Sequence, residues 1–157
     1  MSGLVRRVRA NVDDRCVVTR IRKKGCRVSL DSAPASRVIV DFDKAGSPLG
    51  PSDRRCDYLF VADVAARDGW VAPLELKRGR FHTSECVRQL QAGATAAEKL
   101  VPPSAGVRFR PIAVVGGRMT KEEWNKSRQK QNAVRFHGKF ELLRSLTSGQ
   151  KLADELR

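Results

Sequence analysis

Asp57 and the triplet Glu75-Leu76-Lys77 carry side chains that can do chemistry on a phosphate. Carboxylate oxygens are the ligands that hard cations such as Mg²⁺ prefer in proteins. A metal ion held in this way lowers the pKa of a bound water and polarises a phosphate ester. A neighbouring lysine orients the water or stabilises the negative charge that develops. These residue types therefore predict metal-dependent hydrolysis of a phosphodiester bond.

A β-hairpin is the element that would bring these residues together. Residues 57–62 and 70–77 are predicted to be its strands, because both segments are short, apolar and rich in β-branched or aromatic side chains. Residues 67–69, Arg-Asp-Gly, supply the turn. Antiparallel pairing then places Asp57, at the start of the first strand, beside the end of the second.

Side-chain alternation along the second strand decides which groups face Asp57. Glu75 and Lys77 point to the same face. Leu74 and Leu76 point to the other face, towards a core. The carboxylates of Asp57 and Glu75, with the main-chain carbonyl of Leu76, then offer a partial oxygen shell for Mg²⁺ or Mn²⁺. The alternative is an ion-paired cluster on a solvated sheet face, without a catalytic role.

The rest of the chain predicts an α/β (α+β) fold, a mixed central sheet flanked by helices, in a single domain spanning residues 1–157. Helical spacing of apolar residues, capping residues and proline or glycine breaks define the elements. Before the Asp57 hairpin we expect a helix from Leu4 to Val12, residues 16–18 as its continuation or as a strand, a break at Gly25, strands at 27–30 and 37–43, and a loop at 45–53.

After the Asp57 hairpin we expect a helix that is capped by Thr83 or Ser84 and ended by Pro102, and then a strand at 107–115. A polar helix should follow, opened by the capping box Thr120–Glu123 with Trp124 as its apolar anchor. Residues 134–146 should form a closing hairpin, or a strand and a short helix.

An aspartate followed by a hairpin that ends in Glu-x-Lys resembles the PD-(D/E)xK nuclease superfamily. The resemblance covers residues 37–116 and implies a restriction-endonuclease-like fold with an αβββαβ core, to which residues 117–157 add a C-terminal helix and hairpin. It implies that a metal-activated water attacks the phosphate, with Asp57, Glu75 and Lys77 as catalytic residues and Asp57, Glu75 and the Leu76 carbonyl as metal ligands. Several family members carry a glutamine on the helix after the motif. Gln89 matches that place, and Gln91 is the alternative.

Two positions depart from the family pattern. Cys56 stands where the family name has proline, a position at which the family tolerates change. Many members also carry a glutamate on the N-terminal helix, but this chain has no glutamate before Glu75. The nearest acids are Asp13, Asp14, Asp41 and Asp43. The missing acid implies one metal ion rather than two, or weak activity.

The charge of the chain predicts a polyanionic partner. Lys and Arg number 31 against 17 Asp and Glu, a formal net charge of +14. We expect the partner to be nucleic acid, DNA rather than RNA. We expect no membrane partner, because no stretch approaches the ~20 apolar residues of a spanning helix. We expect a cytoplasmic location, because no apolar segment of the kind found in secretory signals follows the first arginines. The residues expected to contact the nucleic-acid backbone are Arg78, Arg80, Arg88, Lys126, Arg128 and Lys130.

The four cysteines and two histidines of the chain are expected to be structural. Cys16, Cys26, Cys56 and Cys86 have no metal-ligand spacing and are expected to be buried, although a distributed metal site or an iron–sulfur cluster stays an alternative. His82, close to Lys77 in the sequence, has substrate contact as its alternative role, and His137 is isolated.

Two other functions remain open at the level of the sequence. The first is a non-catalytic, basic nucleic-acid-binding module on the same fold. The second is an RNA-binding or ribosome-associated protein whose Glu-x-Lys is accidental. That second idea predicts that Asp57 lies far from Glu75. If the chain cuts duplexes or junctions, two active sites are needed, and a homodimer is expected.

Overall fold

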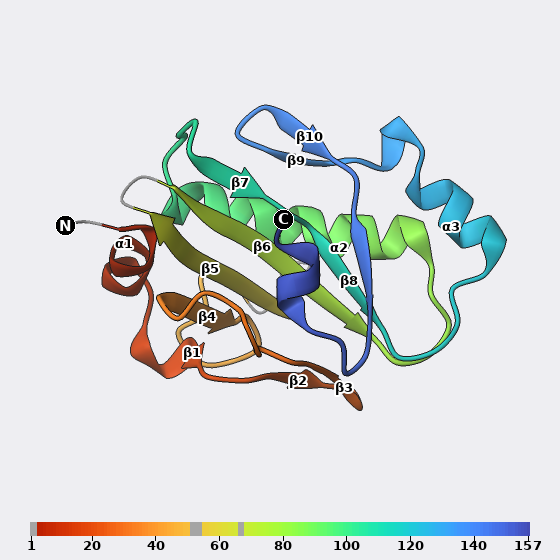
Figure 1. Cartoon of the computed structure of the whole chain (residues 1–157), viewed down its shortest axis with the longest axis horizontal. Helices are drawn as coiled ribbons and strands as arrows, with labels where there is room; N and C mark the ends of the chain where they lie inside the picture. Colours follow the sequence, from red (N-terminus) through yellow and green to blue (C-terminus); the bar gives the residue numbers. More distant parts are fainter. Residues whose placement is uncertain (1–2, 51–54, 66–67) are drawn as a thin grey trace.

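A mixed β-sheet forms the centre of the molecule in a computed structural model that describes residues 3–50, 55–65 and 68–157. Within these ranges the sheet has seven strands, ordered β1-β4-β5-β6-β8-β11, with β7 also paired to β6 (Figure 1). Helices lie against it, so the expected mixed sheet with flanking helices is confirmed. The strands are β1 (Val17–Val18), β4 (Arg37–Asp41), β5 (Tyr58–Ala65), β6 (Asp68–Lys77), β7 (Val107–Phe109), β8 (Ile112–Val115) and β11 (Arg144–Thr147).

Antiparallel pairing joins β4, β5 and β6, and parallel pairing adds β8 and then β11. Tyr58 pairs with Leu74 in the β5–β6 ladder, so the predicted hairpin is confirmed. Lys77 pairs with Val115 in the parallel β6–β8 ladder. Parallel strands cannot be joined by a tight turn, and helix α2 (Thr83–Leu100) makes the crossover between them.

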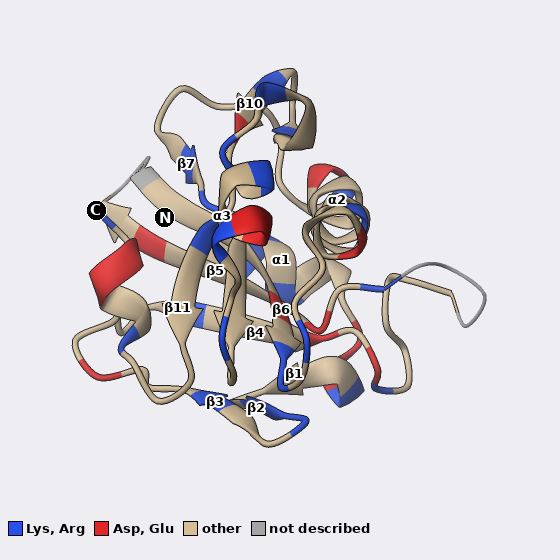
Figure 2. Ribbon diagram, turned by 90° about the vertical axis from the view of Figure 1, so that its right-hand side faces the viewer, with Lys and Arg blue, Asp and Glu red and all other residues tan. Residues whose placement is uncertain are grey.

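Helix α2 covers one face of the sheet at close range, as the edge-on view in Figure 2 shows. Leu90, Ala94 and Ala97 are buried in this layer. Gly93 permits the approach, because a Cβ at this position would lie 2.8 Å from the Cβ of Cys56. The Cys56 thiol is itself buried and donates to the Leu74 carbonyl at 2.9 Å.

The opposite face of the sheet is covered by the hairpin of β2 (Ile21–Lys23) and β3 (Cys26–Val28) and by the short 3₁₀ turn η3 (Leu152–Glu155). Leu74 and Leu76 of β6 point into this layer, as the alternation along the strand predicts. Glu75 and Lys77 therefore belong to the α2 side.

The β2–β3 hairpin has a tight turn at one end and is anchored at the other. Lys24 and Gly25 form its turn with φ values of 56° and 73°, the left-handed conformation that such two-residue turns require. At its base, Ser29 donates to the Gln150 carbonyl at 3.0 Å, and Leu152 donates to the Ser29 carbonyl at 2.9 Å. The C-terminal segment thus anchors the hairpin.

Smaller elements complete the structure around α2 and the edge of the sheet. They are α1 (Leu4–Asn11), η1 (Asp14–Cys16), α3 (Lys121–Ser127), η2 (Lys130–Asn132), β9 (Val134–Phe136) and β10 (Lys139–Glu141). The N-terminal helix is confirmed, and residues 17–18 form a strand rather than continue a helix. The closing hairpin expected over 134–146 is present as β9–β10 but ends at Glu141, and residues 144–147 form the separate strand β11 of the central sheet. The strand expected at 27–30 is β3, which begins at Cys26.

Three local expectations are wrong. The strand expected at 107–115 is broken into β7 and β8 at Pro111, which has no N–H for a ladder. Neither Thr83 nor Ser84 caps α2 with its side chain; the Thr83 nitrogen donates instead to Glu123 Oε1 of α3 at 2.7 Å. Trp124 is not a buried anchor, because 42% of it is exposed.

Two expected connections lie partly outside the described residues. In the turn expected at 67–69, residue 67 lies outside them, whereas Gly69 is part of β6 and the strand already begins at 68. In the loop expected at 45–53, residues 45–50 form neither helix nor strand, and 51–53 lie outside the described residues.

Candidate active site

Asp57 and Glu75 meet at the C-terminal end of β6. Asp57 Oδ2 accepts a hydrogen bond from the Leu76 nitrogen at 2.8 Å, which fixes its carboxylate beside the strand. The Asp57 nitrogen donates to the Leu74 carbonyl at 3.2 Å. Only 4% of Asp57 and 1% of Glu75 are exposed. A sequence separation of eighteen positions is thus closed by the hairpin, and the two acids form one buried site.

The ammonium group of Lys24 binds this site from the β2–β3 turn. Its Nζ lies 3.1 Å from Asp57 Oδ2, 3.2 Å from Glu75 Oε2 and 3.4 Å from the Leu76 carbonyl oxygen. These are the three groups that the resemblance named as metal ligands. One positive centre therefore already sits among all three oxygens.

Burial and like charge raise the free energy of the ionised Glu75. Burial, and then the neighbouring Asp57 carboxylate, raise the pKa of Glu75 to about 7, while Lys24 and Lys77 act in the opposite direction. Burial alone would lower the pKa of Lys24, but the charges of Glu75 and Asp57 outweigh it and raise that pKa. Two carboxylates in one buried place thus need a cation between them.

Lys77 approaches the same carboxylate from the α2 side. Its Nζ lies 3.5 Å from Glu75 Oε2 and 3.5 Å from Glu85 Oε1, in the first turn of α2. The side chain is 16% exposed, so its ammonium group lies at the mouth of the site. Lys77 is therefore placed to meet an anion that enters from solvent.

A second charged group stands beside the first. Lys23 Nζ lies 2.6 Å from Asp41 Oδ1, 2.8 Å from Asp43 Oδ2 and 3.0 Å from the Asp57 carbonyl oxygen. Asp41 and Asp43, two of the acids considered for the missing glutamate, are therefore paired with Lys23. The Lys24 ammonium is bound by Asp57 and Glu75 instead.

The two glutamines of α2 separate clearly in the structure. Gln91 donates to the Arg135 carbonyl at 2.9 Å and accepts from the Arg135 nitrogen at 2.8 Å, so it holds β9 against the helix. Gln89 lies one turn after Glu85. Among the described residues, Gln89 Oε1 and Glu75 Oε1 are buried and make no hydrogen bond. Gln89 thus has the free acceptor that Gln91 lacks.

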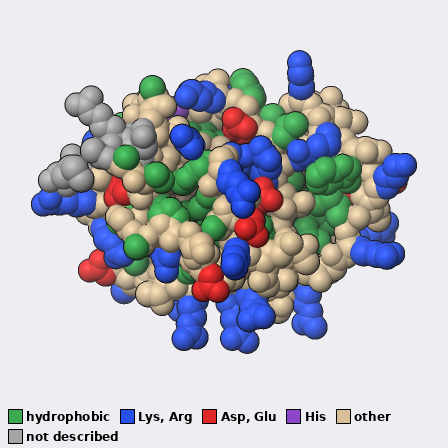
Figure 3. Space-filling model, in the orientation of Figure 1, with side chains coloured by type: hydrophobic (Ala, Val, Ile, Leu, Met, Phe, Trp, Pro, Cys, Tyr) green, Lys and Arg blue, Asp and Glu red, His purple; other side chains and the backbone are tan. Residues whose placement is uncertain are grey.

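The residues expected to contact a nucleic-acid backbone lie just after β6, on α2, and on α3 or just after it. Arg128 is half-buried: it donates to the Leu143 carbonyl, and its guanidinium lies 4.7 Å from the centre of the Trp124 ring. Lys126 forms ion pairs with Glu122 and Glu123. The remaining four, Arg78, Arg80, Arg88 and Lys130, are exposed. Figure 3 shows further Lys and Arg side chains along the lower edge of one face of the molecule.

The histidines and cysteines lie apart from the carboxylates or deep in the core. His137 forms the β9–β10 turn, where its ring nitrogen Nε2 lies 2.6 Å from the Val101 carbonyl. His82 is exposed just before α2. The expected burial of Cys16, Cys26, Cys56 and Cys86 is confirmed, and all four thiols are free.

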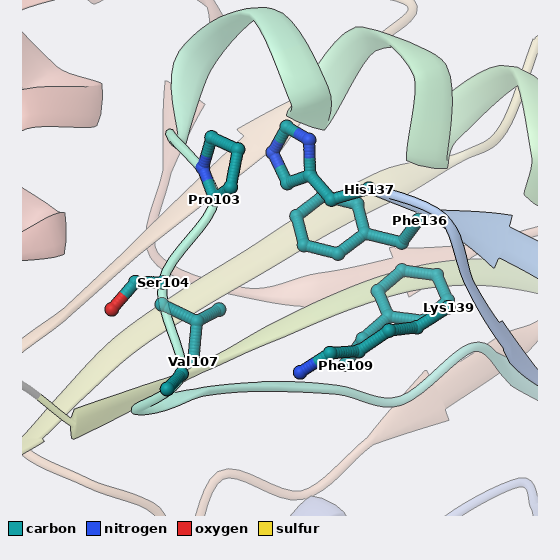
Figure 4. Close-up of a pocket in the computed structure, with 8 residues that line it drawn as sticks. Pro103, Ser104, Val107, Phe109, Phe136, His137 and Lys139 are labelled. Atoms are coloured by element: carbon teal, nitrogen blue, oxygen red, sulfur yellow. The ribbon is translucent and has the colours of Figure 1, made fainter.

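An apolar pocket of about 390 Å³ lies elsewhere, between β7 and the β9–β10 turn (Figure 4). The stacked rings of Phe109 and Phe136, 4.7 Å apart, form one of its walls. None of the candidate catalytic residues lines it. It therefore belongs to the packing of β9 and β10 on α2 and not to the carboxylate site.

The donor set at the carboxylates fits a hard divalent cation. Two carboxylates and one carbonyl converge on the ammonium group of Lys24, and a buried oxygen of Glu75 is left without a hydrogen bond to the described residues. Oxygen atoms of these kinds are the ligands that a hard divalent cation prefers. Within the described ranges, no three His, Cys, Asp or Glu side chains gather closely enough to hold a metal without other groups. The Leu76 carbonyl and water would complete such a shell.

Comparison with known proteins adds no relative. No family model, curated protein or solved structure matches the chain. The described residues also include no helix long and apolar enough to cross a membrane. The residues themselves therefore carry the functional argument.

Proposed function

We propose that this chain is a nuclease that hydrolyses phosphodiester bonds of nucleic acid, in the first place DNA, with Mg²⁺ or Mn²⁺. The observation that carries the proposal is the position of Lys24 Nζ, 3.1–3.4 Å from Asp57 Oδ2, Glu75 Oε2 and the Leu76 carbonyl. Oxygens that already bind the ammonium group of Lys24 have the charge and the positions to bind a metal ion in its place.

The order of elements supports a restriction-endonuclease-like fold. A helix, three antiparallel strands, a second helix and a parallel strand follow one another as α1, β4, β5, β6, α2 and β8. This is the αβββαβ order that the Glu-x-Lys resemblance implies. The short β1, β2, β3 and β7 are additions to that order.

Each residue of the site has a distinct task in the proposed reaction. A bound metal would lower the pKa of a water and polarise the phosphate. Asp57, Glu75 and the Leu76 carbonyl would hold that metal, and the Leu76 N–H keeps the Asp57 carboxylate in place. Lys77 would bind a phosphate oxygen or orient the water from the mouth of the site. The Gln89 oxygen, which has no hydrogen-bond partner among the described residues, would accept a hydrogen bond from that water.

A second candidate function is a nucleic-acid-binding module without catalysis. The same Lys24 favours it, because its ammonium group neutralises both carboxylates and leaves them no need of a metal. In that case Lys24 stays in place at all times, and the basic residues around the site carry the binding. A homodimer is proposed only for the cutting of duplexes, which requires two such sites.

The decisive experiment compares cutting and binding in one set of variants. Labelled single-stranded, duplex and branched DNA, and RNA, are incubated with Mg²⁺ or Mn²⁺ and with wild type, Asp57→Asn, Glu75→Gln, Lys77→Ala or Lys139→Ala. Lys139 is an exposed lysine of β10 and serves as the matched control for Lys77. We expect metal-dependent cutting that falls ~100-fold or more in the first three variants, with binding largely retained.

Two outcomes would contradict the proposal. Binding by wild type without cutting under either metal would favour the second candidate. Cutting that survives both Glu75→Gln and Lys77→Ala would place the active site elsewhere in the molecule.

A further inference from the structure

A second hollow, of about 200 Å³, opens between α3 and the C-terminal ends of β8 and β11. Val115 supplies an apolar surface on the α2 side of the sheet, and Ser145 and Thr147 supply hydroxyl groups. Trp124 of α3 closes one side. The hollow therefore combines a flat aromatic wall with hydrogen-bonding groups, which is what an aromatic heterocycle needs.

The indole of Trp124 is held as a wall and remains accessible. It is 42% exposed, although it is the large apolar residue of its helix. The guanidinium of Arg128 lies 4.7 Å from the ring centre and is fixed by the Leu143 carbonyl. Arg128 thus covers one face of the indole, and a further ring would stack on the other face.

The hollow lies on the same sheet face as the proposed active site. Lys77 pairs with Val115, and Val115 pairs with Thr147, in two parallel ladders. Paired residues of neighbouring strands share a face, so the three side chains form a row across β6, β8 and β11. Two inter-strand spacings separate Lys77 from Thr147, roughly 10 Å. A nucleotide or two covers that span.

Helix α3 is also joined directly to the active-site end of α2. Thr83 donates its N–H to Glu123 Oε1 at 2.7 Å and its hydroxyl to the Glu123 carbonyl at 2.8 Å. Glu85, two residues further on, reaches Lys77. These contacts link the helix that carries Trp124 to the first turn of α2, which contacts Lys77.

We propose that this hollow binds a nucleobase of the strand whose phosphate lies at Asp57, Glu75 and Lys77, with the base stacked on Trp124. The inference rests on the proposed function for the position of that phosphate. A nucleobase is the ring that accompanies a phosphate chain, and a protein with a net charge of +14 attracts such chains. Stacking accepts every base, so the hollow sets the register of the strand rather than a sequence preference.

An abasic scan of a short single-stranded DNA tests the proposal. Each nucleotide in turn is replaced by an abasic one, and affinity is measured in EDTA, which prevents cutting, for wild type and Trp124→Ala. We expect one abasic position to weaken wild-type binding about tenfold, and Trp124→Ala to weaken binding of the intact DNA by a similar factor. Both changes together should weaken binding no more than either alone, because they remove the same contact.

Matched variants separate stacking from damage to the fold. Trp124→Phe should recover most of the affinity, and Phe140→Ala, which removes the exposed ring of β10, should leave affinity unchanged. Thermal unfolding of Trp124→Ala verifies that the fold persists. Wild-type affinity in Trp124→Ala, or losses that multiply at every abasic position, would overturn the nucleobase site.

The outcomes also separate this site from the proposed function. An abasic effect that depends on Trp124, without metal-dependent cutting by wild type, leaves the base site standing and removes the nuclease. Cutting without that effect leaves the nuclease and removes the base site. A wild type that does not bind DNA contradicts both.

Discussion

Glu75 is a buried acid with a pKa raised to about 7 by burial and by Asp57. Since its ordinary value is 4.5, the folded chain binds more protons than the unfolded chain between these values. The free energy of unfolding therefore falls as the pH rises through this window. The shift corresponds to about 3 kcal/mol.

We predict this loss in the metal-free wild type and not in Glu75→Gln, whose amide does not titrate. Urea denaturation in EDTA between pH 5 and 8 measures the difference between the two proteins. Glu122→Gln, on exposed α3, is the control and should follow wild type. A difference that is constant over this range would contradict the raised pKa.

A metal bound by Asp57, Glu75 and the Leu76 carbonyl would compete with Lys24 for the three oxygens that its ammonium group contacts. Removing its ammonium group in Lys24→Ala should raise the affinity for Mn²⁺ about tenfold or more, because a charged hydrogen-bonded group no longer has to be displaced. The metal-free variant should also be less stable than wild type, since Asp57 and Glu75 then lack this counter-charge. Titration calorimetry with Mn²⁺ measures the first effect.

Lys139→Ala is again the control and should bind Mn²⁺ as wild type does. An unchanged or weaker affinity in Lys24→Ala would mean that Lys24 does not occupy the place of the metal.

At the residue scale, local pattern predicted the carboxylates but not their cation. Asp57 and Glu75 could be brought together because strand alternation and a short hairpin fix their relative positions. Lys24 comes from a hairpin whose first strand, Ile21–Lys23, is not among the predicted elements. The signal was present: Lys24-Gly25 stands between two short alternating segments. Nothing local says which distant strand such a turn covers.

Among the elements, α3 completes the start of α2. Glu123 accepts from the Thr83 nitrogen, so it satisfies a donor that the helix itself leaves open. We predict that Glu123→Ala lowers the free energy of unfolding by about 1–2 kcal/mol. Glu122→Ala, whose side chain is 80% exposed, should change it by less than about 0.5 kcal/mol.

Urea denaturation of both variants at neutral pH makes this comparison. Equal effects of the two substitutions would show that the link between α3 and α2 contributes nothing to stability.

Element types were easier to predict from the sequence than their partners. The capping box at Thr120 is real, because Thr120 Oγ1 accepts from the Glu123 nitrogen at 3.1 Å. Its glutamate, however, reaches another helix instead of closing the box. Pro111 is visible in the sequence, and its missing N–H is already a reason not to expect a single strand over 107–115. Helix, strand and break are local properties, whereas the choice of partner depends on the folded chain.

The whole molecule carries its charge of +14 on many elements, and binding of nucleic acid should reflect this. Affinity should fall steeply with salt, because each phosphate contact releases a counterion. Arg80→Ala and Arg88→Ala should each reduce the slope of log affinity against log salt by roughly 0.7–1. Arg7→Ala, exposed on α1 at the far end of the sheet, should not.

Binding isotherms over a range of salt concentrations supply these slopes. Equal reductions by all three substitutions would indicate diffuse attraction and no defined path for the strand.

The hydrogen bonds between Ser29 and residues 150 and 152 join segments that are synthesised far apart in time. A ribosome makes Lys24, Asp57 and Glu75 long before it makes the segment that anchors the Lys24 hairpin. A nascent chain that already contains both acids therefore lacks the fixed base from which Lys24 reaches them. Residues 150–152 must therefore leave the exit tunnel before this base can form and hold Lys24 at the two carboxylates.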